Sequence, residues 1–280
     1  MAYRISVASA ARCARILAPQ PGFVLHDIAQ YAPADRVDAA RAFWLDAQPG
    51  VMAVVAGSPA ERAGLRAGDR LRAVNGQPFD QGDSRGAPTR AGVERAQRLL
   101  GAAMRSGPVV LRVSSRTGDR DVRFLAEAGC PTNVELIPGD TVNAWADGDR
   151  VMVSEGLLRR CATDGDLALV IGHEMAHNLL HHRRRLAAEG IVANTLLPAA
   201  AGSSDMREVR ETEEQADRLA VGLADAAGYD LGDAESFPRA LLRGDVTVAS
   251  THPARDRRLT LLRAAIVEAR RGRARSGILT

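Results

Sequence analysis

The stretch His173-Glu174-Met175-Ala176-His177 decides how the second half of this 280-residue chain folds and which chemistry it supports. Residues four apart lie on the same face of an α-helix, so His173 and His177 can both bind one metal ion about 2 Å away. Glu174 lies beside the pair. Two histidines with an adjacent carboxylate suit zinc-dependent hydrolysis, in which the ion polarises a carbonyl and the carboxylate accepts a proton from water.

The residues around this motif predict a buried helix. An apolar run at 167–171 precedes it, and Leu179 and Leu180 follow it. Such a run seats a helix in a hydrophobic core. We therefore expect the two histidines to be held rigidly on a core helix.

A third zinc ligand is expected downstream, where residues 210–220 change from polar to apolar and predict a second helix with an acidic start. Glu213 and Asp217 share one face of that helix. One carboxylate could bind zinc, while the other accepts a ring N–H from a ligand histidine and so fixes its tautomer. The alternative is a solvated acidic first turn, which the helix dipole also favours.

The order of these two motifs resembles the HtpX and CAAX-prenyl-protease family of zinc metallopeptidases, which are of the gluzincin type. The second motif of the family, E-x-x-A-D, is matched here from Glu213 to Asp217. The resemblance implies one Zn²⁺ per chain, with His173, His177 and Glu213 as ligands. It makes Glu174 the general base and Asp217 the partner of a ligand histidine.

Two further stretches match the same family. Residues 143–148 and 151–158 resemble the strand pair that precedes the zinc helix, and Thr251-His252-Pro253 resembles a late His-Pro motif, followed by Arg258. We expect His252 to act as a reversible fourth ligand or to stabilise a developing oxyanion, with Arg258 as a positioning charge. A structural capping role for His252 is the alternative.

The first of these strands is expected to bind substrate. Asn143, Ala144 and Trp145 suit an exposed edge strand, with which an unfolded chain could pair. The alternative is an ordinary hairpin edge that turns at Asp147-Gly148. His181 and His182 follow the zinc motif, but continued helix twist and rise carry His181 away from the metal, and we expect His182 to be exposed or structural.

The first half of the chain carries a different signature. From Ser58 to Gly76 it follows the pattern S-P-A-x-x-A-G-L-x-x-G-D-x-L-x-x-V-N-G, which resembles a PDZ domain of the bacterial protease-associated kind. Such a domain binds an extended peptide as an added strand. The residues expected to form its groove are Pro49, Gly50, Val51, Met52 and Ala53. The alternative is a PDZ fold kept as a spacer or lid.

These motifs predict an α+β chain in which a gluzincin metallopeptidase domain, with its HExxH helix and edge-strand sheet, is joined to a PDZ domain. We expect a lead at residues 1–37 that packs on the peptidase domain, a PDZ domain at 38–128 and the peptidase domain at 129–280. In the lead, Tyr3, Ile5 and Val7 alternate like a strand.

Composition and charge agree with a globular protein. Hydrophobic residues make up 46% of the chain, and its formal net charge is only +3. All 37 basic residues are arginine and 34 acidic residues are interspersed among them, which does not indicate a nucleic-acid surface. The apolar segment at 191–201 is too short for a membrane span, which takes about 20 residues. No transmembrane segment is expected.

The sequence opens without an apolar signal region, so the protein is either cytoplasmic or exported with its signal peptide absent from this sequence. Soluble members of the resembled family are typically exported, which favours the periplasm. An exported chain would otherwise expose thiols at Cys13 and Cys130, at the two ends of the PDZ segment, so we expect them to form a disulfide.

The predicted function is zinc-dependent endopeptidase activity on unfolded or misfolded proteins, a role in protein quality control. The PDZ domain would recognise substrate or regulate the enzyme. The alternative is a non-enzymatic, chaperone-like protein in which the metal and the PDZ groove only hold a client. Glu174 favours the enzyme, because a pure binder needs no base beside its metal.

Overall fold

The computed structural model describes residues 1–82, 85–191, 203–232 and 255–276, and the chain divides into two compact units. The first unit comprises Met1–Leu17 and Gly129–Thr280, and the second comprises Ala18–Ala128. The expected boundary after residue 37 is thus replaced by one after residue 17. The reason is that Phe23–His26 is a strand of the second unit, paired with Gly50–Val54.

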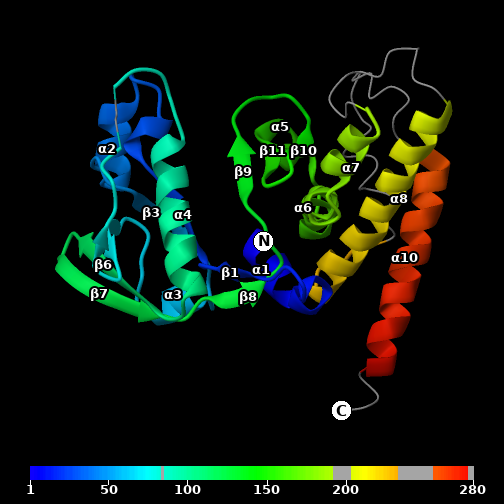
Figure 1. Ribbon diagram of the computed structural model, residues 1–280, viewed down its shortest axis with the longest axis horizontal. Helices are drawn as coiled ribbons and strands as arrows, with labels where there is room; N and C mark the ends of the chain where they lie inside the picture. Colours follow the sequence, from blue (N-terminus) through cyan, green and yellow to red (C-terminus); the bar gives the residue numbers. More distant parts are fainter. Residues whose placement is uncertain (83–84, 192–202, 233–254, 277–280) are drawn as a thin grey trace. The chain divides into compact units, whose positions relative to one another are not determined.

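The first unit is built around three long helices that pack in sequence, α6 against α8 and α8 against α10 (Figure 1). Almost every residue of α6 from Gly165 to Ala176 is buried, as expected for a helix that runs through a core. Its start is fixed by a capping box between Thr163 and Asp166. The helices of this unit are α1 (Ala2–Ala8), α5 (Glu155–Arg160), α6 (Asp164–Leu179), α7 (His182–Ala188), α8 (Ser203–Ala226) and α10 (Arg255–Ser276), with the 3₁₀ turn η1 (Ala10–Cys13).

A three-stranded sheet precedes α6. Its strands are β9 (Val134–Ile137), β10 (Ala144–Ala146) and β11 (Val151–Ser154), in the order β10–β11–β9. β11 runs antiparallel to β10 and parallel to β9. In the described part of the chain, β10 ends this order and has no strand on its outer edge. Of the residues expected in the substrate strand, Ala144 and Trp145 belong to β10, and Asn143 directly precedes it.

The expected strand at residues 3–7 is wrong, because these residues form helix α1. A short alternation of apolar residues does not separate a strand from one helical face. Ile5 is completely buried and joins the core around α6 and α8. The helix therefore buries its apolar residues against other helices of the same unit.

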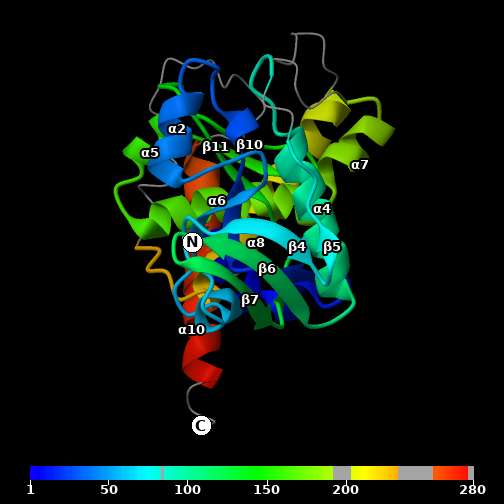
Figure 2. The ribbon, with the colours of Figure 1, turned by 90° about the vertical axis from the view of Figure 1, so that its left-hand side faces the viewer.

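The second unit is a curved sheet with one amphipathic helix, α4 (Ala91–Arg105), and it contains the predicted PDZ elements. The path of the sheet is β2–β3–β4–β6–β7, and Figure 2 shows β4, β6 and β7 side by side. α4 turns Val93, Ala96, Leu100 and Met104 into the core. The remaining elements are β1 (Ala18–Gln20), β2 (Phe23–His26), η2 (Ile28–Gln30), α2 (Arg36–Phe43), β3 (Gly50–Val54), α3 (Pro59–Arg62), β4 (Arg70–Val74), β5 (Gln77–Pro78), β6 (Val109–Ser115), β7 (Gly118–Phe124) and β8 (Glu127–Gly129).

The turn chemistry of the second unit follows its sequence. Ser58 caps α3 by accepting a hydrogen bond from the amide of Glu61, with Pro59 at the first helical position. Asn75 and Gly76, between β4 and β5, both adopt positive φ, at 49° and 82°, which is the conformation that Asn-Gly favours in a tight hairpin turn. These local signals of the motif are confirmed.

The predicted disulfide between Cys13 and Cys130 is present, and both residues belong to the first unit. Their Cα atoms lie 5.3 Å apart, although 117 positions separate them in sequence. Ser6 strengthens the same junction by donating from Oγ to the carbonyl of Cys130 at 2.6 Å. The chain therefore leaves and re-enters the first unit at one covalently fixed point.

Candidate metal centre

Three candidate metal ligands converge where α6 crosses α8. A side chain on Gly172 would meet the carbonyl oxygen of Ala220 at 3.1 Å, so the two helices approach closely at this point. One face of α6 carries His173 and His177, and Glu213 lies on α8 two turns before Ala220. All three offer a ligand atom within 4.8 Å of the others.

The spacing of these donors fits a tetrahedral zinc ion. The Nε2 atoms of His173 and His177 are 3.1 Å apart, and they lie 3.4 and 3.5 Å from the two carboxylate oxygens of Glu213. Donors about 2.1 Å from a tetrahedral zinc lie about 3.4 Å from one another. Two imidazoles and one carboxylate leave the fourth corner for water or substrate, as in catalytic zinc sites.

His173 is oriented by a buried ion pair. Its Nδ1 lies 2.9 Å from Oδ1 of Asp217, and Arg258 donates to both oxygens of the same carboxylate. A carboxylate only accepts hydrogen bonds, so Nδ1 of His173 carries the proton and Nε2 faces Glu213. The structure thus brings Asp217 to His173, as the resemblance implies, and adds Arg258, which was expected only as a positioning charge beside His252.

The electrostatics of the cluster favour a cation between its carboxylates. Burial and Arg258 lower the pKa of His173, but its bonds to Asp217 and Glu213 outweigh both and raise it to about 10. His177 behaves in the opposite way, because burial and then its charged neighbour His173 lower its pKa to about 3. A positive charge is therefore favoured between these carboxylates, and a bound cation would supply one.

Glu174 is buried within this cluster, with 9% of its surface exposed. Burial lowers the pKa of Arg258, but Asp217, followed by Glu213 and Glu174, raises it above its ordinary value. A carboxylate in this position is held next to the metal donors without being one of them. Its role as the general base stays a prediction.

The predicted substrate strand lies beside the metal helix. β10 packs against α6 and carries Ala144 and Trp145, with Asn143 just before it. Asn178 fixes the hairpin that follows: it donates from Nδ2 to the carbonyl of Arg150 at 2.9 Å and accepts from the amide of Gly148 at 2.8 Å. Sequence reasoning missed this anchor, although Asn178 directly follows the zinc motif.

His182 was expected to be exposed or structural, and it is completely enclosed next to His177, with 1% exposure. Burial lowers its pKa. His252, the remaining candidate in this region, lies outside the described residues, and so does the His-Pro turn that contains it.

The strand expected to line the PDZ groove is in the wrong position. Residues 50–54 form β3, which pairs with β2 on one side and, at Gly50, with β4 on the other, so it lies inside the sheet and not at its edge. Pro49 precedes this paired strand, and Gly50 to Ala53 belong to it. The end of the described sheet is instead β2, and α4 packs near it.

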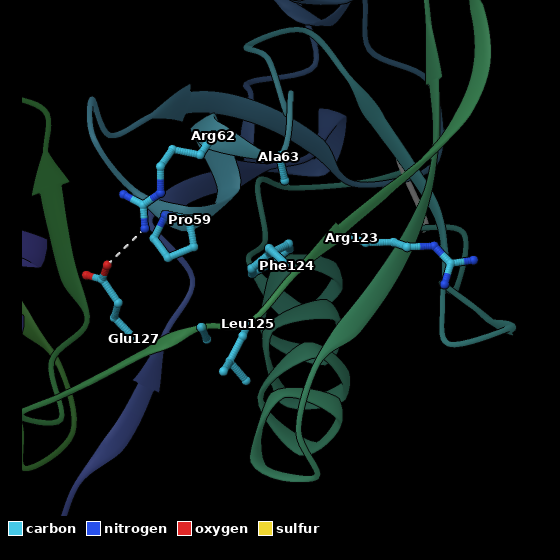
Figure 3. Close-up of a pocket in the computed structure, with 8 residues that line it drawn as sticks. Pro59, Arg62, Ala63, Arg123, Phe124, Leu125 and Glu127 are labelled. Atoms are coloured by element: carbon cyan, nitrogen blue, oxygen red, sulfur yellow. Dashed lines mark hydrogen bonds and ion pairs between the residues drawn. The ribbon is translucent and has the colours of Figure 1, made fainter.

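A separate shallow hollow lies beside α3 in the second unit (Figure 3). Leu125, 59% exposed, forms part of its apolar lining, and Arg62 and Glu127 pair at 3.3 Å along it. Both charged side chains are exposed, so this pair contributes little to stability. The hollow shares no residue with the donor cluster, which belongs to the first unit.

Comparisons with known proteins match both units. Residues 115–208 match the model of Peptidase family M48, and residues 50–85 match the model of a PDZ domain. The beta-barrel assembly-enhancing protease of Yersinia pestis is 24% identical over 185 residues, which cover 55% of this chain and 38% of that protein. The solved PDZ domain of HtrA3, bound to a phage-derived ligand, is 21% identical and has a TM-score of 0.29, covering 40% of this chain and 88% of that one.

By these matches the chain is similar to peptidase family M48 over residues 115–208 and to a PDZ domain over residues 50–85. The chain corresponds to well under half the length of the relative from Yersinia pestis. In the described residues, the helices are either too short or too polar to cross a lipid bilayer.

Proposed function

We propose that this protein is a zinc-dependent endopeptidase that cleaves unfolded or misfolded proteins. The observation that carries the proposal is the donor set of His173, His177 and Glu213: the two Nε2 atoms lie 3.1 Å apart and 3.4 and 3.5 Å from the two Glu213 oxygens, close to the spacing of donors around tetrahedral zinc. Glu174, next to His173 in the sequence, supplies the base that such a site needs for hydrolysis.

Each residue of the cluster then has a distinct role. His173, His177 and Glu213 would hold the ion, which when bound supplies a Lewis acid that polarises the scissile carbonyl and acidifies water. Glu174 accepts the proton of the attacking water and returns it to the leaving amine. Asp217 and Arg258 hold His173 in the tautomer that directs Nε2 to the ion.

Substrate binding is proposed to use exposed strand edges. An extended chain adds to β10 beside α6, so that its scissile bond lies over the metal. A peptide binds the second unit in the same manner, at the edge of β2. Both binding modes use backbone N–H and C=O groups of the substrate, which are already hydrogen-bonded in a folded protein. They therefore suit unfolded substrates and a role in protein quality control.

An exported, periplasmic location is proposed. The Cys13–Cys130 disulfide is of the kind that persists in oxidising compartments. The name of the relative from Yersinia pestis also links that protein to beta-barrel assembly.

The test measures zinc and cleavage together. We expect one zinc per chain, cleavage of casein that chelation abolishes and zinc restores, and a Glu174→Gln variant that keeps its zinc but is about 10²–10⁴-fold slower. Glu213→Ala should lose both zinc and activity. A wild-type protein that holds one zinc and binds unfolded casein without cutting it would instead establish the chaperone-like alternative.

A further inference from the structure

The chain turns sharply after the metal helix and brings His182 back against His177. α6 ends at Leu179, and His181 then adopts a left-handed conformation with φ of 53° before α7 begins at His182. The imidazole rings of His177 and His182 meet edge to face, with centroids 4.9 Å apart. Their Nδ1 atoms are 3.0 Å apart, which is a hydrogen-bond distance.

Which of the two Nδ1 atoms carries the proton follows from the contacts on the other side of His182, with Gln215 and Arg185. Arg185 donates from Nη1 to Oε1 of Gln215 at 3.0 Å. Because arginine has no acceptor, the Gln215 atom that faces it must be the oxygen. His182 places Nε2 3.2 Å from the same oxygen, so Nε2 of His182 must carry a proton.

The proton on Nε2 of His182 then fixes the tautomers of both His182 and His177. A neutral imidazole that is protonated on Nε2 has its lone pair on Nδ1, so His182 accepts the hydrogen bond from Nδ1 of His177. His177 consequently has its lone pair on Nε2, the atom that faces His173 and Glu213. The opposite tautomer would direct a proton into the donor cluster and prevent metal binding.

We propose that His182 is a positioning residue for the metal site: together with Gln215 it holds His177 in the tautomer whose Nε2 can bind zinc. The expected effect on zinc binding rests on the proposed zinc site. The tautomer of His177 rests on the contacts alone. The two ligand histidines are thereby oriented differently, His173 by a carboxylate and His177 by a second, neutral imidazole.

The tautomer can be tested without metal or substrate. Long-range ¹H–¹⁵N correlation spectra of the zinc-free protein at pH 7.5 should show Nδ1 of His177 as a protonated nitrogen and Nδ1 of His182 as an unprotonated one. The reverse pattern would overturn the proposal. Since this measurement needs no zinc, it remains decisive even when the proposed enzymatic function fails.

The consequence is tested with a matched pair of substitutions of nearly equal size. His182→Asn presents Oδ1 close to the position of the imidazole Nδ1 and can accept the same bond, whereas His182→Leu cannot. In competition with a chromophoric chelator, His182→Leu should raise the Kd for zinc about 10–100-fold and His182→Asn by less than about threefold. Equal losses in the two variants would overturn the positioning role.

Leu186→Ala provides the structural control, because Leu186 is buried on α7 but takes no part in the chain of contacts. It should lower the Tm and leave the zinc Kd unchanged. If it weakens zinc binding as much as His182→Leu does, the effect on zinc comes from the packing of α7, and the proposal is wrong.

Discussion

Arg258 holds both carboxylate oxygens of Asp217, donating from Nε to Oδ2 and from Nη2 to Oδ1 at 2.7 Å each. Both side chains are almost completely buried, and Asp217 also accepts from His173. The pair therefore links α10, α8 and the metal helix α6. A fork of two parallel bonds fixes the orientation of the carboxylate as well as its charge.

The burial of this ion pair predicts that loss of Arg258 costs much more stability than loss of the exposed Arg257. Arg258→Met should destabilise the protein by about 3–5 kcal/mol, because it leaves a buried carboxylate without its partner. The matched control is Arg257→Met, which removes a neighbouring arginine whose bond to Glu214 is equally short, 2.7 Å, but whose side chain is 65% exposed. That change should cost less than about 1 kcal/mol. Urea unfolding followed by circular dichroism measures both, and equal costs would contradict the prediction.

Two helical glycines should respond to alanine in opposite directions. A Cβ on Gly165, in the first turn of α6, would lie 1.9 Å from the carbonyl oxygen of Asp230, so Gly165→Ala should destabilise by about 2–3 kcal/mol. A Cβ on Gly101, within α4, would meet only the end of the Arg105 side chain at an ordinary 3.5 Å. Gly101→Ala should therefore stabilise by about 0.5–1 kcal/mol. Thermal unfolding measures whether each substitution lowers or raises the Tm.

His26 predicts a loss of stability in mild acid. Burial lowers its pKa from the ordinary 6.5 to about 4, so between these values the unfolded chain binds a proton that the folded chain does not. Stability attributable to His26 is therefore present above pH 6.5 and is lost as the pH falls towards 4, by at most about 3 kcal/mol. The free energy of unfolding of His26→Leu should change less between pH 7 and pH 4.5 than that of the wild type. Parallel pH profiles would refute this.

Removal of the second unit should separate substrate handling from chemistry. All three metal donors belong to the first unit, so replacing residues 18–128 with a short Gly-Ser linker should leave zinc content unchanged. A short fluorogenic peptide should be cleaved with nearly the same kcat/KM. Cleavage of an unfolded protein should slow, because a second binding site raises the effective concentration of the same chain near the metal. An equal change for both substrates would indicate a structural or lid role.

The metal donors could be predicted from sequence because their spacing is local. His173 and His177 share a helical face, and so do Glu213 and Asp217, so only the meeting of two helices remained to be found. The contact between His182 and His177 could not be predicted, for the opposite reason. The place of His182 beside His177 depends on the left-handed conformation of His181, which interrupts the helix and which no periodicity reveals.

Long-range pairing explains the other errors. The strand β2 was assigned to the lead because residues 27–49 separate it from β3, and sequence patterns do not report which strands pair across such a connection. The groove is consequently expected on β3, which directly precedes the recognisable PDZ pattern at Ser58–Gly76 but lies inside the sheet. The disulfide, by contrast, could be anticipated from where its two cysteines lie relative to the inserted unit.

That disulfide also determines what happens to the chain after a cut. Backbone cleavage between residues 14 and 129 opens the polypeptide but releases no fragment, because Cys13 and Cys130 keep the two pieces joined. The N-terminal piece then stays attached, with Ser9 donating from its hydroxyl to the carbonyl of Leu223 on α8. A nick in the second unit therefore leaves the helical core around the metal donors complete until a reductant frees the piece that carries residues 1–13.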